Sequence, residues 1–558
     1  VGDKIQKFSC KHNCYYCPNE PNMPRSYLSE ESGVRRGHRN HWDPIQQFYA
    51  RAWAYYVNGH PIDKVELLVL GGTWSEYPYE YQETFMRDIF YSANTFFEPK
   101  KREPLSLAEE QIKNEAAECR VIGVTLETRP DCIDADELRR MRKYGCTRVQ
   151  IGIQHTNDKI LKLINRGCEN KDAINCVRLL KNVGFKIDFH LMPDLPGSSI
   201  RLDKQMSVQK SIPTNNYFVL TFFLKKKKKN EKQWKLYPCQ IVPWTVIKKW
   251  YDEGKYKPYE IKDLIELMIH VKAQVHPWIR LNRVVRDIPN QYIIGGNEIT
   301  NLRQAKTTPT GDAKLFIRKY ESSGGDEYFL SFETEDESTI FGFVRLRLVH
   351  DKNITDEVFP ELKDCAMIRE LHVYGQMKPV GNKENVRTQD YKTQHTGFGR
   401  RLMIAAEQIA VLKGFTRVSV IAGIGTRNYY RKIGYELIET YLIKDIAATD
   451  IKQIISQYTL TEVPYENKFE KNTVKEYNKR LQQEIEELKD DEFQPYQFTV
   501  TKWELTQKTK AFSISQYLLL FFIVSVLSSA FFCGGTAIIS FRFHQNDVKF
   551  LTPKCVIQ

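Results

Sequence analysis

The sequence predicts an α/β protein with a partial barrel of six βα units, a second α/β domain and a C-terminal transmembrane helix. Six apolar runs alternate with helix-like stretches between residues 65 and 285. From about residue 310 the pattern changes to antiparallel strands, followed by a glycine turn, an amphipathic helix and a further strand. Residues 511–541 contain no charged side chain. A chain of 558 residues is too long for one hydrophobic core, so several domains are expected.

The first predicted domain covers residues 1–305. Buried-type strands that alternate with amphipathic helices are typical of βα units around a parallel sheet. The predicted helices include residues 134–146 and 170–185. Loops after the carboxyl ends of such strands carry the functional site, and the segments GGT, ETRPD, IQH and MPDLPG all stand there. The six predicted strands are residues 65–72, 120–130, 147–155, 185–197, 233–239 and 279–289.

The second predicted domain covers residues 306–446. Its first part reads as antiparallel strands at 328–333, 339–349 and 366–375. A glycine turn, an amphipathic helix and one more strand follow within residues 393–423. We therefore predict a second α/β fold with its own sheet.

The remaining segments are predicted to lie outside both domains. Residues 447–510 are polar and helix-prone, which favours a linker. The uncharged stretch 511–541 exceeds the roughly 20 residues that span a bilayer, and residues 542–558 form a short tail. Runs of Phe and Lys at 215–232 interrupt the barrel and predict an insertion or a retained intron. Because the chain begins at Val1, we also expect an N-terminal part to be missing.

The composition favours a protein of a reducing compartment with an anionic partner. Hydrophobic residues at 42% and charged residues at 27% are ordinary for globular proteins. Nine of the twelve cysteines are scattered singly, which argues against a disulfide framework. We expect the cytoplasm, with the tail in an intracellular membrane; the nucleus is the alternative. A net charge of +13 fits RNA, and the basic stretch 35–44 fits either phosphate contacts or a solvated loop.

The segment CKHNCYYC holds three cysteines, Cys10, Cys14 and Cys17, within eight residues. One interpretation is a zinc site with a fourth ligand from a nearby histidine. The other is an iron–sulfur cluster on three thiolates, whose remaining iron is open to a small chelating cofactor. The candidates for the fourth zinc ligand are His12, His38 and His41.

Two glycine-containing segments are candidate anion sites. Gly71–Thr73 follows an apolar strand, where glycines allow the backbone to approach a charged ligand. QHTGFG, residues 394–399, begins a helix whose free N–H groups and positive end suit a pyrophosphate. This segment is not GxGxxG, so a dinucleotide is not expected. An acyl-CoA site fits better.

Together these motifs resemble the family of Elongator catalytic subunits, in which a radical S-adenosylmethionine (SAM) barrel is fused to a GNAT-type acetyltransferase domain. The matching blocks span roughly residues 10–446 in the family's order. The family's basic N-terminal tRNA-binding segment is absent from this sequence, and residues 215–232 and the chain beyond 446 are additions. The matching blocks are CKHNCYYCP, DKVELLVLGGT, LETRPD, YGCTRVQIGIQ, NRG, HLMPDLPG, YPC, RVVRDIP, RELHVYG, QHTGFG and GTRNYYRKIGYEL.

The resemblance implies roles for particular residues. Lys64 would contact acetyl-CoA from the barrel, Tyr429 would lie near the thioester, and Tyr430 would lie beside it. The [4Fe–4S] ligands would be Cys10, Cys14 and Cys17. The residues expected at cofactors through backbone groups are Gly71, Gly72 and Thr73 in the barrel, and Glu370, Leu371, His372, Val373, Gly397, Phe398 and Gly399 at acetyl-CoA.

The activity implied by the resemblance is carboxymethylation of the tRNA wobble uridine at C5. The cluster would cleave SAM reductively to a 5′-deoxyadenosyl radical, which would generate an acetyl radical that adds to the base. Hydrolysis of the thioester would then leave a carboxymethyl group. The expected partners are tRNA, other Elongator subunits, a membrane through the tail and a second copy of the chain. The alternatives are a protein lysine acetyltransferase that uses only the second domain, and a membrane-tethered scaffold without activity.

Overall fold

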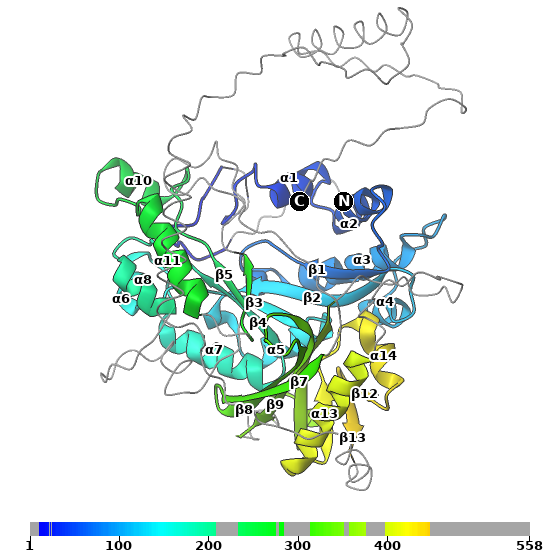
Figure 1. The fold of residues 1–558 in the computed structure, drawn as a ribbon. Helices are drawn as coiled ribbons and strands as arrows, with labels where there is room; N and C mark the ends of the chain where they lie inside the picture. Colours follow the sequence, from blue (N-terminus) through cyan, green and yellow to red (C-terminus); the bar gives the residue numbers. More distant parts are fainter. Residues whose placement is uncertain are drawn as a thin grey trace, which may run out of the picture. The chain divides into compact units, whose positions relative to one another are not determined.

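The computed structural model divides the chain into two compact units, residues 1–476 and 477–558, and all described residues belong to the first (Figure 1). The described residues are 10–21, 23, 25–207, 233–274, 278–283, 313–350, 357–374 and 397–446.

The first sheet is the predicted half-barrel. Its six strands follow one another in chain order, and every neighbouring pair is parallel. All six predicted strands are present, although β4 ends at Leu191, six residues before the end of the predicted run, and the predicted end at residue 289 lies outside the described residues. The strands are β1 (Lys64–Leu68), β2 (Arg120–Thr128), β3 (Arg148–Gln154), β4 (Lys186–Leu191), β5 (Gln233–Leu236) and β6 (Arg280–Arg283).

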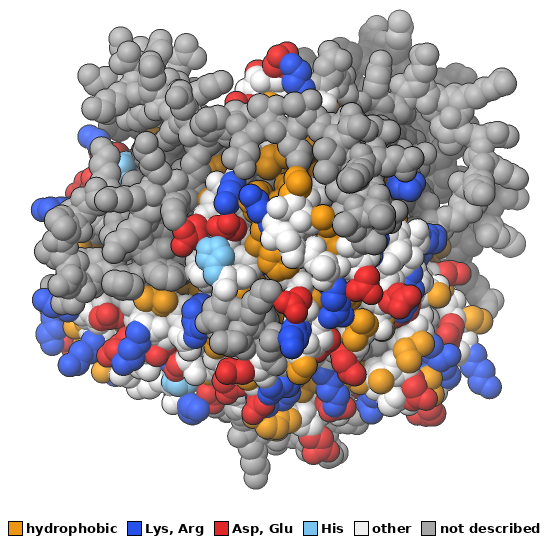
Figure 2. Space-filling model, turned by 90° about the horizontal axis from the view of Figure 1, so that it is seen from below, with side chains coloured by type: hydrophobic (Ala, Val, Ile, Leu, Met, Phe, Trp, Pro, Cys, Tyr) orange, Lys and Arg blue, Asp and Glu red, His pale blue; other side chains and the backbone are white. Residues whose placement is uncertain are grey.

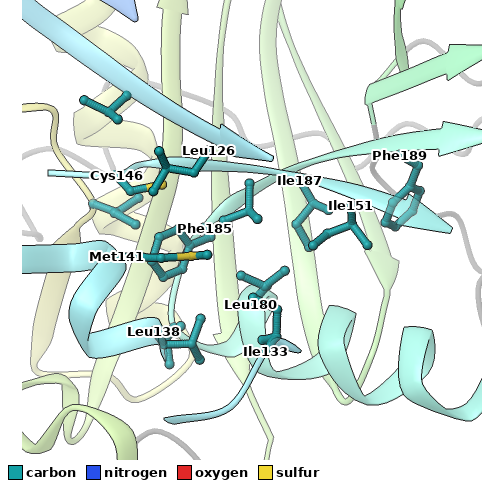
Figure 3. Close-up of a cluster of buried hydrophobic side chains, with 14 of the residues drawn as sticks. Leu126, Ile133, Leu138, Met141, Cys146, Ile151, Leu180, Phe185, Ile187 and Phe189 are labelled. Carbon is teal, nitrogen blue, oxygen red and sulfur yellow. The ribbon is translucent and has the colours of Figure 1, made fainter. Parts of the chain in front are cut away.

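Helices connect these strands, and two of them match the predicted helices. α5 begins after Asp134, whose side chain accepts a hydrogen bond from the Glu137 amide and so caps the helix. Apolar side chains recur on the inner faces of α5 and α7 at helical spacing and pack on the sheet (Figure 3). The helices are α1 (Ser32–Arg39), α2 (Pro44–Val57), α3 (Tyr79–Thr95), α4 (Leu107–Asn114), α5 (Ala135–Lys143), α6 (Asp158–Leu163), α7 (Asn170–Asn182), α8 (Ile200–Ser207), α10 (Val246–Asp252) and α11 (Ile261–Gln274).

A seven-stranded sheet forms the second domain, in the order β12-β13-β11-β10-β9-β8-β7. Its neighbours are antiparallel except β10 and β11, which run parallel. The sequence predicted β8 to β11 and the helix α13, but not β7, β12 or β13. The elements are β7 (Lys314–Glu321), β8 (Gly325–Glu333), β9 (Ile340–Val349), β10 (Cys365–Val373), α13 (Phe398–Leu412), β11 (Arg417–Val420), α14 (Arg427–Arg431), β12 (Glu436–Ile438) and β13 (Tyr441–Asp445).

One hydrophobic cluster runs through both sheets. It includes Met367 and Tyr441 of the second domain together with the barrel core, and the Tyr441 hydroxyl donates to the Val183 carbonyl at 2.7 Å. Gly423 lies so close to β2 that a Cβ there would stand 2.0 Å from the Ile122 carbonyl oxygen, which only glycine permits. A further cluster is confined to the second domain. The two sheets therefore form one packed body.

Several predictions fall outside the described residues. These are the insertion at 215–232, the boundary at 305/306, the linker at 447–510, the transmembrane segment at 511–541 and the tail at 542–558. Among the helices that the structure describes, none is both long and apolar enough to cross a bilayer. The transmembrane segment and the domain boundaries remain predictions.

Candidate functional site

The cysteine segment lies against the carboxyl ends of the half-barrel strands. The Cys10 sulfur is 3.7 Å from the Thr73 hydroxyl, in the loop after β1. Cys14 accepts hydrogen bonds at 3.6 Å from Arg129, just after β2, and from Arg166, beyond β3. The Ser26 hydroxyl donates to Cys17 at 3.5 Å. The loops expected to carry the site thus do meet the cysteines.

Electrostatics favour a thiolate at Cys14. A hydrogen bond from Cys17 and the nearby Arg166 and Arg129 guanidiniums hold the pKa of Cys14 at about 4, although burial opposes the charge. Arg129 is itself held by a two-pronged ion pair with Asp131, with both N–O distances 2.9 Å. The site is therefore built to keep an anionic sulfur in place, which suits a metal ligand.

His12, one of the predicted fourth zinc ligands, lies in a polar group separate from the three motif cysteines. His12 does not join them, because its Nε2 is 3.4 Å from a carboxylate oxygen of Glu76. Cys132 completes that separate group, 3.8 Å from the same oxygen. Three thiolates without His12 as a fourth ligand fit an iron–sulfur cluster that leaves one iron open.

The glycine segment after β1 allows a close approach, as expected. Gly72 has φ +86°, and a Cβ there would lie 3.4 Å from the Ser26 hydroxyl that reaches Cys17. A Cβ on Gly71 would lie 2.9 Å from the Tyr77 hydroxyl. Thr73 is buried beside Cys10. Side chains at either glycine would push into the wall of the cysteine site.

A polar group inside the half-barrel was missed by the sequence reasoning. Glu127 of β2 accepts a hydrogen bond from the Tyr27 hydroxyl at 2.8 Å and lies 3.5 Å from His190 of β4. The other His190 nitrogen is 3.1 Å from the Gln150 amide oxygen on β3. The sequence did contain a signal for this group, because polar residues stand at strand positions that face the inside of the half-barrel. Together they offer hydrogen-bonding groups to a ligand near the strand ends.

Four of the residues predicted at acetyl-CoA come together at the start of α13. A Cβ on Gly399 would lie 3.0 Å from the Tyr429 hydroxyl, 3.7 Å from Val373 and 4.0 Å from Leu371. Gly397, at φ +79°, precedes the helix as its N-cap. The absence of a side chain at Gly399 leaves the helix start open beside these three residues.

The edge of β10 is open at the same place. β10 pairs with β11 only over Cys365–Ile368, while residues Glu370–Val373 pair with β9 on the other side. In the described chain no strand covers the second edge of Glu370–Val373. Its main-chain N–H and C=O groups can therefore bond an extended ligand as a neighbouring strand would.

The other predicted residues of this region serve packing or ion pairs through their side chains. Burial would raise the pKa of Glu370, but Arg345 at 2.9 Å and other cations hold it at about 2. Phe398 packs on Phe332 with ring centroids 4.7 Å apart. The rings of His372, Phe343 and Tyr374 contact one another, and Tyr430 lies buried 5.1 Å from the Tyr429 ring.

Lys64 lies at the end of the sheet that faces the second domain. It opens β1 opposite Arg120, and Arg120 meets the loop before Tyr429, since a Cβ on Gly425 would stand 2.6 Å from it. Strand β2 runs nine residues from this end to the cysteine end, a span of about 26 Å. The two candidate sites therefore lie at opposite ends of β2.

A parallel half-barrel with three cysteines at its carboxyl end defines the class of radical SAM enzymes. Residues 8–201 match the model of the Radical SAM superfamily, and residues 232–308 match the Radical_SAM C-terminal domain. This membership implies a [4Fe–4S] cluster and SAM as cofactors, in agreement with the thiolate geometry.

Individual relatives show to which family within the radical SAM enzymes the chain belongs. The chain is 34% identical to the tRNA uridine(34) acetyltransferase of Methanocaldococcus infernus over 78% of this chain and 83% of the relative. It is 33% identical to the human Elongator complex protein 3 over 77% of this chain and 80% of the relative. The solved M. infernus Elp3 with an N-terminal deletion (1–46) matches with TM-score 0.63 and 33% identity, covering 74% of this chain and 97% of that one. The chain belongs to this family of Elongator protein 3 and tRNA uridine(34) acetyltransferases, as its motifs predicted.

Proposed function

We propose that this protein carboxymethylates the wobble uridine of tRNA at C5, with acetyl-CoA and SAM as co-substrates. One observation carries the proposal: the thiolate site at Cys14 and the helix start left open at Gly399 are built on one packed core. Relatives that share most of the chain are named for tRNA uridine 34. The second domain then acts as a GNAT-type acetyltransferase domain.

The barrel residues hold the cofactors of this reaction. Cys10, Cys14 and Cys17 hold the cluster, and Arg129 and Arg166 keep the Cys14 sulfur anionic. When bound, the cluster and SAM supply the radical chemistry. The Glu127 group offers hydrogen bonds from the strand ends to the bound molecule.

The second domain binds the acyl donor. The open edge of β10 pairs with the pantetheine amides, and the N-terminal end of α13 attracts the pyrophosphate through its free N–H groups. Burial raises the pKa of Tyr429, so its hydroxyl stays protonated at neutral pH and can donate to the thioester oxygen. Lys64 reaches the same end of the sheet from the barrel.

The proposal includes the partners that the family suggests, which are tRNA and the other Elongator subunits. A protein lysine acetyltransferase would need only the second domain and would leave the Cys14 site without use. The C-terminal membrane anchor in a cytoplasmic setting and a homodimer stay proposals from the sequence alone.

The test is anaerobic reconstitution of the full chain with iron and sulfide, followed by incubation with SAM, acetyl-CoA, tRNA and a one-electron reductant such as dithionite, and mass spectrometry of nucleosides. We expect a carboxymethylated uridine at position 34 that disappears when SAM is omitted. Acetylation of protein lysines with unchanged nucleosides would instead support the acetyltransferase alternative.

We expect Gly399→Leu to weaken acetyl-CoA binding by at least tenfold. The new side chain would start 3.0 Å from the Tyr429 hydroxyl and fill the opening at the start of α13. Isothermal titration with acetyl-CoA measures the loss. Lys413→Leu, which places the same side chain at the exposed opposite end of α13, should bind normally. Equal affinity of both variants would remove this opening from the acyl-CoA site.

A further inference from the structure

Glu115 of the barrel binds the short helix α14, which carries Tyr429 (Figure 1). The Glu115 carboxylate lies 3.1 Å from a guanidinium nitrogen of Arg427 and forms a second ion pair with Arg431. Its main-chain carbonyl accepts a hydrogen bond from the Asn428 side chain at 2.9 Å. One barrel residue thus contacts both ends of α14. We call Glu115 and these three partners the Glu115 clamp.

The barrel side of the clamp is fixed in place. Asn114, directly before Glu115, is completely buried, and its side-chain oxygen accepts a hydrogen bond from the Val121 amide of β2 at 2.8 Å. The side-chain nitrogen of Asn114 donates to Asn94 of α3 at 2.9 Å. Because these bonds tie the end of α4 to two further elements of the barrel, the barrel sets the position of Glu115.

Helix α14 needs this outside support to hold Tyr429. It spans five residues, little more than one turn, and so short a helix is unstable in water by itself. The second domain anchors α14 through Tyr430, which packs in the second-domain cluster, whereas Tyr429 remains 41% exposed. At the Arg427 end the barrel gives the support, since the preceding loop also lies against Arg120 at Gly425. The orientation of Tyr429 therefore depends on the barrel.

The charges of the clamp are shielded from water. The Glu115 side chain is 12% exposed and that of Arg427 is 8% exposed. Burial lowers the pKa of Arg427, and the hydrogen bond to Glu115 opposes this effect. By contrast, the face seen in Figure 2 mixes Lys and Arg with Asp and Glu at the surface, where ion pairs contribute little. Loss of the Glu115 charge would leave Arg427 desolvated and unpaired, so α14 would shift and carry Tyr429 with it.

We propose that Glu115 is a positioning residue, which sets the place of the Tyr429 hydroxyl at the thioester of acetyl-CoA. This deepens the proposed function and rests on the role given there to Tyr429. The open edge of β10 and the start of α13, which bind the pantetheine and the pyrophosphate, are not part of the Glu115 clamp. Glu115 therefore acts on the reaction of the bound acyl group and not on the binding of acetyl-CoA.

The test follows CoA release by the reconstituted full chain with SAM, reductant and tRNA over a range of acetyl-CoA concentrations. Glu115→Gln should lower kcat roughly 10- to 100-fold, as expected for a displaced hydrogen-bond donor, and change the KM for acetyl-CoA less than about twofold. Glu118→Gln, which removes an exposed carboxylate three residues later, should behave as the unaltered protein. An unchanged kcat in Glu115→Gln, or a change confined to KM, would overturn the proposal.

A double-mutant cycle separates positioning of Tyr429 from a general structural role. Tyr429→Phe should lower kcat by a similar factor, and adding Glu115→Gln to it should cause less than about a twofold further loss, because both substitutions act through one hydroxyl. Losses that multiply would show that Glu115 acts elsewhere and would overturn the proposal. CoA release without carboxymethylated uridine in the unaltered protein would overturn the proposed function alone, and the cycle would still decide the role of Glu115. An unaltered protein that releases no CoA would overturn both.

Discussion

Replacing Cys14 with alanine is expected to abolish cluster binding and uridine modification while acetyl-CoA binding persists. Two thiolates cannot hold a cluster that needs three protein ligands. The loss also leaves the Arg129 and Arg166 guanidiniums, each 3.6 Å from that sulfur, without their anionic partner. Iron content, absorption near 400 nm and nucleoside analysis measure the first effects, and calorimetry measures acetyl-CoA affinity.

The expected independence of the acyl-CoA site follows from its separate support. Cys14 contacts Arg129 just after β2, whereas Gly399 lies beside Tyr429, Val373 and Leu371 of the second domain, which has a hydrophobic cluster of its own. Cys119→Ala, which removes a buried thiol at the other end of β2, should retain iron and activity. A Cys14→Ala protein that keeps its iron would show that the motif is not the ligand set.

The half-barrel could be predicted because the residues that mark each of its strands are close together in the sequence. A parallel strand buried on both faces is a continuous apolar run, and turn residues mark its ends. The three cysteines share one short segment, so their common role needs no knowledge of the fold. The family motifs predicted Gly399 and Tyr429 at one site, and the structure places the Tyr429 hydroxyl 3.0 Å from where a Cβ of residue 399 would stand.

Other features depend on contacts between distant residues. Strand β7 contains Arg318 and Lys319, so its sequence looks exposed, yet Arg318 is buried in an ion pair with Glu333 on β8. The Arg129 and Arg166 contacts with Cys14 join three separate loops. No periodicity within one segment encodes such pairings.

Replacing Glu327 with glutamine is expected to destabilise the protein by about 3–5 kcal/mol, the largest stability effect that the structure predicts. Glu327 of β8 is completely buried, with Arg347 at 2.8 Å, Arg369 at 3.3 Å and Lys181 of the barrel helix α7 at 3.5 Å. Glutamine keeps the shape but leaves three buried cations without their counter-charge. Chemical denaturation measures the free energy of unfolding. Glu335→Gln, at an exposed ion pair with Lys314, should change it by less than about 0.5 kcal/mol.

The same carboxylate predicts how the stability difference varies with pH. Burial alone would raise the pKa of Glu327, but the surrounding cations outweigh it and lower the pKa from 4.5 to about 2. A lowered pKa means that the charged form stabilises the fold above pH 4.5 and that this contribution is lost as the pH falls toward 2. The gap between the unaltered protein and Glu327→Gln should therefore be widest at neutral pH and close progressively in acid. A gap that stays constant with pH would show that the loss comes from packing and not from the charge.

Because Lys181 belongs to the barrel and Glu327 to the second sheet, this substitution also tests whether the two sheets unfold together. Two further partners of Glu327 also reach the barrel: Arg369 donates to the Phe185 carbonyl at 2.5 Å, and Arg347 donates to the Asn182 side chain, so the network crosses the interface at several points. A single core through both sheets predicts one transition, shifted as a whole in Glu327→Gln. Barrel fluorescence and acetyl-CoA binding, followed along the same denaturation series, should change at the same midpoint. If acetyl-CoA binding were lost at a lower denaturant concentration than barrel structure, the second domain would be a separate folding unit, and the coupling through Glu327 would be refuted.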